Sequence, residues 1–190
     1  MPSSLNVPNL LSLSRIFLAP LVVFLLTVRI DLDIPYLVNL GLNITYGDIF
    51  AGVVFIIAAL TDTADGYIAR KKGIVTNFGK FIDPLSDKVL VVAALISLVE
   101  LGRLPAWMVV VIVSRDFVVS GLRMVAAVEG VVIAASWAGK AKTVVQIVAI
   151  SMMIFNVPLA FPAMWLALAL TVWSGAVYLA NGWELIVDTD

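Results

Sequence analysis

The stretch TDTADGYIARKKGIVTNFGKFIDPLSDK, Thr61–Lys88, holds four aspartates, and nearly everything around it is apolar. Asp62 and Asp65 are three residues apart, and Asp83 and Asp87 are four apart. If the backbone is helical, each pair lies on one face of its helix. Because carboxylates are costly in apolar surroundings, we expect these four to have a function.

The composition is that of an integral membrane protein. Of the 190 residues, 62% are hydrophobic and 13% are charged, and the mean hydropathy is +1.09. A soluble domain carries about 25% charged residues. A net charge of −1 leaves no basic face for nucleic acid. The chain has no cysteine and no histidine, which excludes disulfides, thiolate nucleophiles, imidazole bases and Cys/His zinc sites.

Apolar runs of roughly 20 residues predict an all-α integral membrane fold with six transmembrane helices, in one domain over residues 1–190. The third helix decides the architecture. Its purely apolar part, Val89–Leu101, has 13 residues, too few to cross about 30 Å of hydrocarbon. It must therefore begin near Phe78 and include Asp83 and Asp87, with a short basic loop before it. The other expected spans are Leu10–Val28, Ile49–Ile68, Pro105–Val128, Lys140–Phe155 and Ala163–Trp183.

The cations between these spans predict the orientation. Six spans place both termini on one side of the membrane, and most loop cations lie on that side. They are Arg70, Lys71, Lys72, Lys140 and Lys142, whereas the opposite loops hold Arg29 and Arg103. By the positive-inside rule, we expect a multi-pass protein of the cytoplasmic (inner) membrane with both termini and the acidic stretch on the cytoplasmic side.

Four carboxylates near one membrane face favour a divalent metal site. Either protonation or bound cations must neutralise them. All-oxygen ligands select Mg²⁺, Mn²⁺ or Ca²⁺, and one or two such ions suit phosphoryl transfer. Gly66 lies four residues after Asp62 and Gly79 four before Asp83, so a flat base or a diphosphate has room to approach the backbone there.

Structural roles explain some of these residues singly. Asp83, followed by Pro84, is equally well interpreted as a helix N-cap with proline in the first helical position. Ion pairs are a second alternative, either Asp62–Arg70 or Asp87–Lys80. Four acids together in so apolar a chain are much harder to explain in these ways.

The pattern Asp62-x2-Asp65-Gly66-x2-Ala69-Arg70-x8-Gly79-x3-Asp83-x3-Asp87 resembles the complete signature of the CDP-alcohol phosphotransferase family. Its eight fixed positions at fixed spacing make it a specific motif. The resemblance implies a six-helix membrane fold, usually a homodimer, with the active site at the cytoplasmic face. It also implies transfer of a phosphatidyl group from a CDP-linked lipid to an alcohol, with release of CMP.

The same resemblance implies roles for single residues. Asp62, Asp65 and Asp83 would bind the divalent metals, Mg²⁺ or Mn²⁺ and most simply two ions, and Asp87 would share in this or act as the catalytic base. The nucleotide-binding residues implied by it are Asn9, Asp62, Gly66, Ala69, Arg70 and Gly79.

A second polar cluster predicts a site for the phosphate of the acceptor. Arg115 and Arg123 are eight residues apart and share a helix face. Lys140 and Lys142 flank the start of the next helix, where N–H groups favour an anion. Four such cations around a cleft suit a phosphorylated alcohol. For the two lysines alone, a role as positive-inside loop residues is an equal alternative. Asp116 points off the face of Arg115, so we expect Arg115 to pair elsewhere.

Further motifs resemble the bacterial phosphatidylglycerophosphate synthase branch of this family. They are Asn6-Val7-Pro8-Asn9-Leu10 with Arg15, Arg115-Asp116-x4-Gly121-Leu122-Arg123, and Gly139-Lys140-x-Lys142-Thr143. The branch implies CDP-diacylglycerol as donor and glycerol 3-phosphate as acceptor. One departure is Asp116, which stands where glutamate is more usual.

Other functions stay open at this point. The same chemistry with inositol phosphate, serine or phosphatidylglycerol (as in a cardiolipin synthase) is the nearest alternative. A divalent-cation or proton carrier that uses intramembrane acids is an alternative from another class. A carrier distributes polar residues toward both faces, whereas this chain places its acids and most of its cations at one. That asymmetry favours an enzyme.

Overall fold

The computed structural model describes residues 7–28, 44–72, 77–128 and 137–187, with side chains for all of these except 7–9, 11, 62–72, 77–84, 87, 127, 128 and 181–187. The described residues form six α-helices. These are α1 (Val7–Thr27), α3 (Tyr46–Lys72), α4 (Asn77–Glu100), α5 (Ala106–Val128), α6 (Trp137–Ile154) and α7 (Ala160–Val187).

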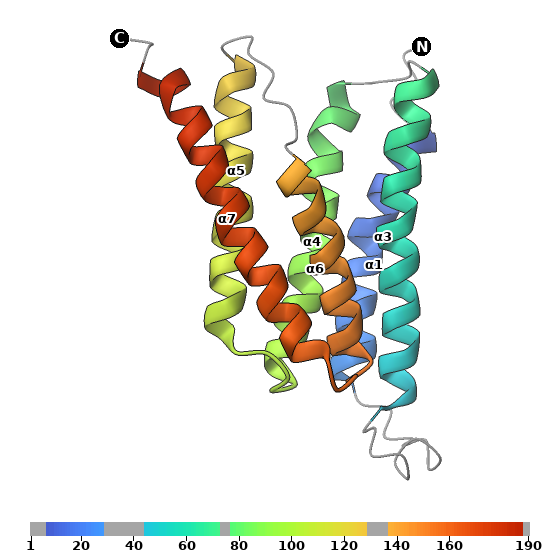
Figure 1. The fold of residues 1–190 in the computed structure, drawn as a ribbon. Helices are drawn as coiled ribbons and strands as arrows, with labels where there is room; N and C mark the ends of the chain where they lie inside the picture. The colour runs from blue at the N-terminus through green and yellow to red at the C-terminus, as the bar shows by residue number, and fades with distance from the viewer. Residues whose placement is uncertain (1–6, 29–43, 73–76, 129–136, 188–190) are drawn as a thin grey trace.

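Successive helices run in opposite directions (Figure 1). At one end of the bundle α1 begins, α3 ends, α4 begins, and α5 and α7 end, with the start of α6 nearer to this end. We call it the acidic end, because α3 and α4 carry the aspartate signature there. At the opposite end α3, α5 and α7 begin. The start of α1 and the end of α7 therefore lie on the same side of the bundle as the aspartates of α3 and α4.

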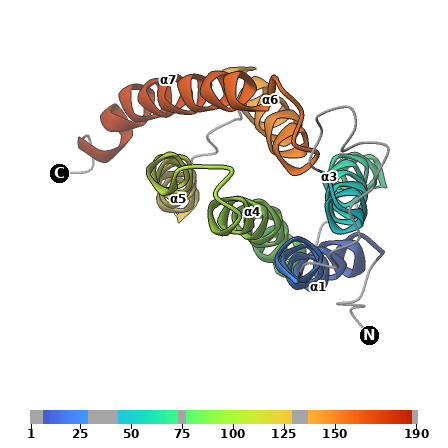
Figure 2. The same ribbon diagram turned by 90° about the horizontal axis from the view of Figure 1, so that it is seen from below.

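The helices form two layers of three, α1–α4–α5 and α3–α6–α7 (Figure 2). α1 packs extensively on α4 and α3, α6 on α7, and α5 on α7. Small side chains let the helix backbones approach closely without a polar interface. Fully buried examples are Ala51, Ala94, Ala149 and Ala167, among larger core residues such as Phe55, Leu95, Ile112 and Ile150.

Each predicted helix is present, with ends that differ by a few residues. The apolar run that was too short by itself lies in α4, which begins at Asn77 and includes Asp83 and Asp87 as predicted. Three predictions are wrong. Lys140 and Lys142 lie in α6 and not in a loop. Residues 70–72 lie in the last turn of α3 and not in a loop, a position that suits cations because a helix C-terminus carries partial negative charge. Asp83 and Pro84 lie inside α4, which excludes the N-cap alternative.

The apolar character of single helices is less uniform than the six predicted spans. Within the described residues, Ala160–Ala180 of α7 is both long and apolar enough to cross a membrane. Ser12–Thr27 and Tyr46–Thr61 are apolar over a shorter length. Charged residues interrupt the others, and these charges are the ones that build the candidate site.

An ion pair with a buried carboxylate joins three segments at the opposite end of the bundle. Arg103 donates to Oδ1 and Oδ2 of Asp48 at 2.8 and 2.9 Å, and to the carbonyl oxygen of Ile154 at 2.8 Å. Asp48 also caps α3: the Thr45 N–H donates to its carboxylate, and its own N–H donates to the Thr45 hydroxyl. The start of α3, the turn after α4 and the end of α6 are thereby joined.

Replacing Asp48 by alanine is expected to lower the free energy of unfolding by about 3–5 kcal/mol. The change leaves Arg103 without its acid and removes the cap of α3. Thermal unfolding in detergent measures the effect. The matched control is Glu100→Gln, which removes an exposed charge from α4 and should leave the midpoint unchanged. Equal midpoints for Asp48→Ala and the wild type would contradict the structural role of the pair.

Candidate active site

A cleft of about 550 Å³ lies between α4, α5, α6 and α7. Five cations line it against one carboxylate among the described residues. The cations are Lys88, Arg115, Arg123, Lys140 and Lys142, and the carboxylate is Asp116. The four cations predicted to form a phosphate site thus surround a single cleft, with Lys88 as a fifth. The excess positive charge attracts an anion.

The two arginines of α5 pack on one aromatic ring of α7. The guanidinium carbons of Arg115 and Arg123 lie 5.6 and 5.8 Å from the ring centroid of Tyr178, within cation–π range. The prediction that these arginines share a helix face is confirmed. Gly175, one turn earlier on α7, leaves room for Arg115, because a Cβ there would lie 2.9 Å from Arg115 Cγ.

Asp116 is the centre of the ionic network in the cleft. Lys142 Nζ donates to both of its carboxylate oxygens, at 2.6 and 2.7 Å, and Arg115 Nη1 donates to Oδ1 at 3.2 Å. The prediction that Arg115 pairs elsewhere is therefore wrong, because its long side chain reaches back to the adjacent carboxylate. Arg115 also donates to Ser174 Oγ of α7 at 2.9 Å. Lys142 is buried, so Asp116 offsets the cost of placing an ammonium inside the bundle.

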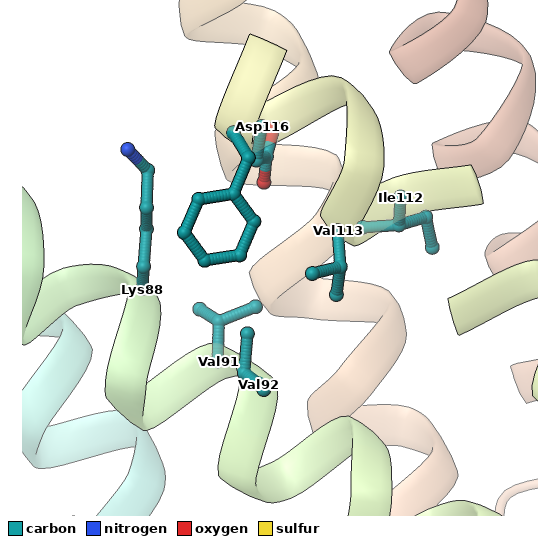
Figure 3. Close-up of a pocket in the computed structure, with 7 residues that line it drawn as sticks. Lys88, Val91, Val92, Ile112, Val113 and Asp116 are labelled. Carbon is teal, nitrogen blue, oxygen red and sulfur yellow. The ribbon is translucent and has the colours of Figure 1, made fainter. Parts of the chain in front are cut away.

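Lys88 brings α4 into the same network (Figure 3). It follows Asp87 directly, and its side chain rises from α4 and lines the same small void as Asp116 of α5. Lys88 Nζ donates to Ser120 Oγ, which in turn donates to the backbone carbonyl oxygen of Asp116 at 2.8 Å. The void beneath, between Val91 and Val92 of α4 and the facing side of α5, is about 10 Å³, room for one water molecule at most.

The sequence did not single out four polar residues that line this cleft: Lys88, Ser120, Gln146 and Tyr178. Two of them carry a signal that was available. Lys88 is a cation in a membrane-type helix, and Gln146 is the only glutamine of the chain, in an apolar run. Tyr178 carries no such signal, because its role depends on how α7 packs against α5.

The backbone of α3 and α4 shows where the residues of the aspartate signature lie. Asp62 and Asp65 lie in the last three turns of α3, and Asp83 and Asp87 in the first three of α4. Only residues 73–76 separate the two helices, so both pairs belong to the acidic end (Figure 1). The other signature positions, Gly66, Ala69, Arg70 and Gly79, lie on the same helices, and Asn9 lies in the first turn of α1.

The side chains of all these signature residues lie outside the described ones, and so do the alternative pairs Asp62–Arg70 and Asp87–Lys80. Within the described side chains, no group of three acids could hold a metal. Arg15, a residue of the N-terminal motif, is described: it is buried in α1 and donates to Ser12 Oγ at 3.1 Å. α1 packs on both α3 and α4, so Arg15 lies on a helix that contacts both acid-bearing helices.

Fold and site together define a helical bundle with a cationic cleft that is lined in part by α4, one of the two acid-bearing helices. This arrangement suits an enzyme that handles phosphate groups. The sequence model of the family described as CDP-alcohol phosphatidyltransferase matches residues 5–173. The chain belongs to this family of enzymes, and the resemblance carried by its aspartate signature is confirmed.

Two curated relatives are similar over nearly the whole chain. The CDP-diacylglycerol–glycerol-3-phosphate 3-phosphatidyltransferase of Bacillus subtilis (strain 168) is 46% identical over 189 residues, which cover 95% of this chain and 97% of the relative. A Mycobacterium tuberculosis protein (strain CDC 1551 / Oshkosh), named "Probable phosphatidylglycerophosphate synthase", is 40% identical over 183 residues, which cover 93% of this chain and 81% of the relative.

Proposed function

We propose that this chain is a membrane phosphatidyltransferase of phospholipid biosynthesis, which converts CDP-diacylglycerol and glycerol 3-phosphate to phosphatidylglycerophosphate and CMP. The cationic cleft carries this proposal: Arg115, Arg123, Lys140 and Lys142 surround one cavity, which Lys88 joins to the helix of Asp83 and Asp87. The name of the similar Bacillus subtilis protein supports the choice of both substrates, and the name of the Mycobacterium tuberculosis protein supports the product.

The charge of the cleft favours a phosphorylated acceptor. Arg115 and Arg123 are held on one ring and present their guanidinium groups from the same helix, a geometry suited to phosphate oxygens. Serine is a zwitterion without a phosphate group, so it carries no net negative charge to match such a surplus of cations. A carrier is disfavoured because Asp48 and Arg103, charged residues at the opposite end, bind each other and so are already neutralised.

The exposed surface supports a location in the membrane. Large apolar side chains are exposed on all six helices, among them Phe17, Phe50, Ile96, Phe117, Val148 and Trp173. Such a surface is unfavourable in water and suits contact with lipid tails. Helices of 18–28 residues have lengths of about 27–42 Å, against a hydrocarbon thickness of about 30 Å.

We therefore propose six transmembrane helices in the inner membrane. The acidic end and both termini are assigned to the cytoplasm, because Arg123, Lys140 and Lys142 belong to that half of the bundle. Assembly as a homodimer, implied by the family, is part of the proposal and is tested by the mass of the detergent-solubilised protein.

We assign the divalent metals to Asp62, Asp65, Asp83 and Asp87. Their donor atoms are all oxygens, which fits two Mg²⁺ or Mn²⁺ ions, and the pairs lie three and four residues apart in continuous helices. Bound metal would neutralise the diphosphate of the donor and stabilise the charge on the departing CMP. The residues assigned to the cytidine diphosphate are Asn9, Asp62, Gly66, Ala69, Arg70 and Gly79.

In the proposed reaction, the Asp87 carboxylate accepts the proton of the acceptor hydroxyl. The hydroxyl oxygen then forms a bond to the phosphorus atom that carries diacylglycerol, while the bond from this phosphorus to the oxygen of CMP breaks. CMP leaves with the electron pair. Arg115 and Arg123 hold the acceptor phosphate, which keeps its hydroxyl close to the donor. The acyl chains of the donor stay in the bilayer and pass between the helices, so only the headgroup reaches the site.

CMP release by the purified protein tests the proposal. The assay contains CDP-diacylglycerol, Mg²⁺ or Mn²⁺, and one acceptor: glycerol 3-phosphate, inositol phosphate, serine or phosphatidylglycerol. We expect release with glycerol 3-phosphate and none with Asp83→Asn. Release with another acceptor alone would keep the chemistry and refute the choice of acceptor. No release with any acceptor would favour a carrier or an inactive subunit.

Removal of divalent metal is expected to abolish CMP release. The four aspartates would then repel each other and the donor diphosphate, so activity should fall to background in excess EDTA. Adding Mg²⁺ or Mn²⁺ beyond the chelator should restore it, and EDTA presaturated with Mg²⁺ serves as the control. Full activity in excess EDTA would contradict the metal assignment.

A further inference from the structure

The cleft contains a buried amide that the proposed reaction does not use. Gln146 lies on α6, is 3% exposed and lines the cleft. Its Nε2 atom is buried and has no hydrogen-bond partner among the described residues. An amide nitrogen offers two donors, and leaving them unsatisfied inside a bundle costs free energy. Such a group calls for an explanation.

Two buried hydrogen-bond donors without a partner in the described part of the chain belong to residues that line this cleft. Within the described side chains, three buried polar atoms have no partner: Nε of Arg15, Nε of Arg115 and Nε2 of Gln146. Arg115 and Gln146 both line the cleft, from α5 and α6. Both atoms are donors and neither can accept a hydrogen bond. A ligand that satisfies them must therefore supply acceptor oxygens.

The position of Gln146 indicates which oxygens these are. It follows Lys142 by four residues, so the two side chains lie on the same face of α6, about 6 Å apart along the helix axis. The Lys142 ammonium is occupied by both oxygens of Asp116. Beyond Gln146 this face continues with Ala149 and Ile150 in the apolar core. Gln146 is thus the innermost polar group that α6 contributes to the cleft.

We propose that Gln146 is a specificity-determining residue of the acceptor site, whose amide donates a hydrogen bond to a phosphate oxygen of the phosphorylated alcohol. Phosphate oxygens accept and do not donate at neutral pH when ionised, which matches a site of cations and unpartnered N–H donors. The inference rests on the proposed function for the identity of the alcohol. Binding of a phosphate group in the cleft does not require catalysis.

Gln146→Leu tests this role. The substitution keeps a side chain of similar size and removes the amide. In the absence of ligand, the melting temperature in detergent should stay equal or rise by about 2–4 °C, because an unsatisfied buried donor is removed. The dissociation constant for inorganic phosphate, obtained from phosphate-dependent thermal shifts at constant ionic strength, should rise about tenfold to a hundredfold. The dissociation constant for glycerol 3-phosphate should rise by the same factor.

Two further variants keep the test decisive. Gln146→Glu retains the shape and places a carboxylate beside the ligand, so it should abolish the phosphate-dependent shift even if the leucine variant does not fold. Ser151→Ala, on α6 outside the cleft lining, removes a hydroxyl bonded to the Ile147 carbonyl and should leave phosphate binding unchanged. A folded Gln146→Leu protein with wild-type phosphate affinity would overturn the inference.

The wild-type protein separates this inference from the proposed function. Phosphate binding that depends on Gln146, without CMP release under any condition, would refute the proposed reaction and leave the inference standing. CMP release without any phosphate-dependent shift at concentrations that saturate glycerol 3-phosphate turnover would overturn the inference and leave the reaction standing.

Discussion

Replacing Asp87 by asparagine is expected to lower kcat for CMP release by about 10²–10⁴-fold, the usual contribution of a general base. Asparagine has nearly the shape of aspartate and does not accept the proton of the acceptor hydroxyl. Asp87 lies in the first three turns of α4, and Lys88 beside it reaches Ser120 of α5. The carboxylate therefore belongs to the helix that adjoins the acceptor cleft. Initial rates at saturating substrates and metal measure the change.

The metal dependence distinguishes a base from a ligand. If Asp87 acts as the base, the Mg²⁺ concentration for half-maximal rate stays that of the wild type while kcat falls. Glu100→Gln, at the other end of α4 and exposed, is the matched control and should retain full activity. A variant whose activity returns at high Mg²⁺ would show that Asp87 is primarily a metal ligand. Wild-type activity in Asp87→Asn would contradict both roles.

Reversing the charge of Arg123 is expected to raise KM for glycerol 3-phosphate by about 100-fold, since a hydrogen bond to a charged group contributes roughly 1.5–3 kcal/mol and the new carboxylate repels phosphate. Arg123 lines the cleft and packs on Tyr178 beside Arg115. KM for CDP-diacylglycerol should change little, because the cytidine diphosphate is assigned to residues of α1, α3 and the start of α4. Steady-state kinetics of Arg123→Glu with each substrate varied in turn separate the two effects.

Arg123→Lys is the companion variant. It keeps the positive charge but loses the planar guanidinium group and much of the stacking on Tyr178. Its KM for glycerol 3-phosphate should therefore lie between the values of the wild type and of Arg123→Glu. If Arg123→Glu raised both KM values equally, Arg123 would act on the fold or on the donor and not on the acceptor. Unchanged kinetics with glycerol 3-phosphate would remove Arg123 from the acceptor site.

The fold was predictable because the forces that choose it are local in sequence. Runs of apolar residues of the right length predict membrane helices, and the shortness of Val89–Leu101 required α4 to extend back through Asp83. The same reasoning placed residues 70–72 in a loop, whereas α3 continues through them. A helix end depends on small energies, here the favourable position of cations at a helix C-terminus.

The residues of the candidate site were predictable from the sequence, but their contacts with one another were not. The aspartate signature is a matter of spacing along two helices, and spacing is readable from the sequence. The cluster of Arg115, Arg123, Lys140 and Lys142 was also predicted, and these residues do surround one cleft. Their partners were not: Arg115 was expected to pair elsewhere and instead contacts Asp116, which binds Lys142 with both oxygens.

By itself, the sequence determined a membrane-type helical bundle, the family to which the chain belongs, and the residues available for its chemistry. These follow from composition, from apolar run length and from a motif at fixed spacing. Only the tertiary structure decided that Tyr178 supports two arginines, that Lys88 links α4 to α5 and that Gln146 keeps an unpartnered amide in the cleft. The physical reason is distance: such contacts join helices far apart in the chain, and their partners depend on how the helices pack.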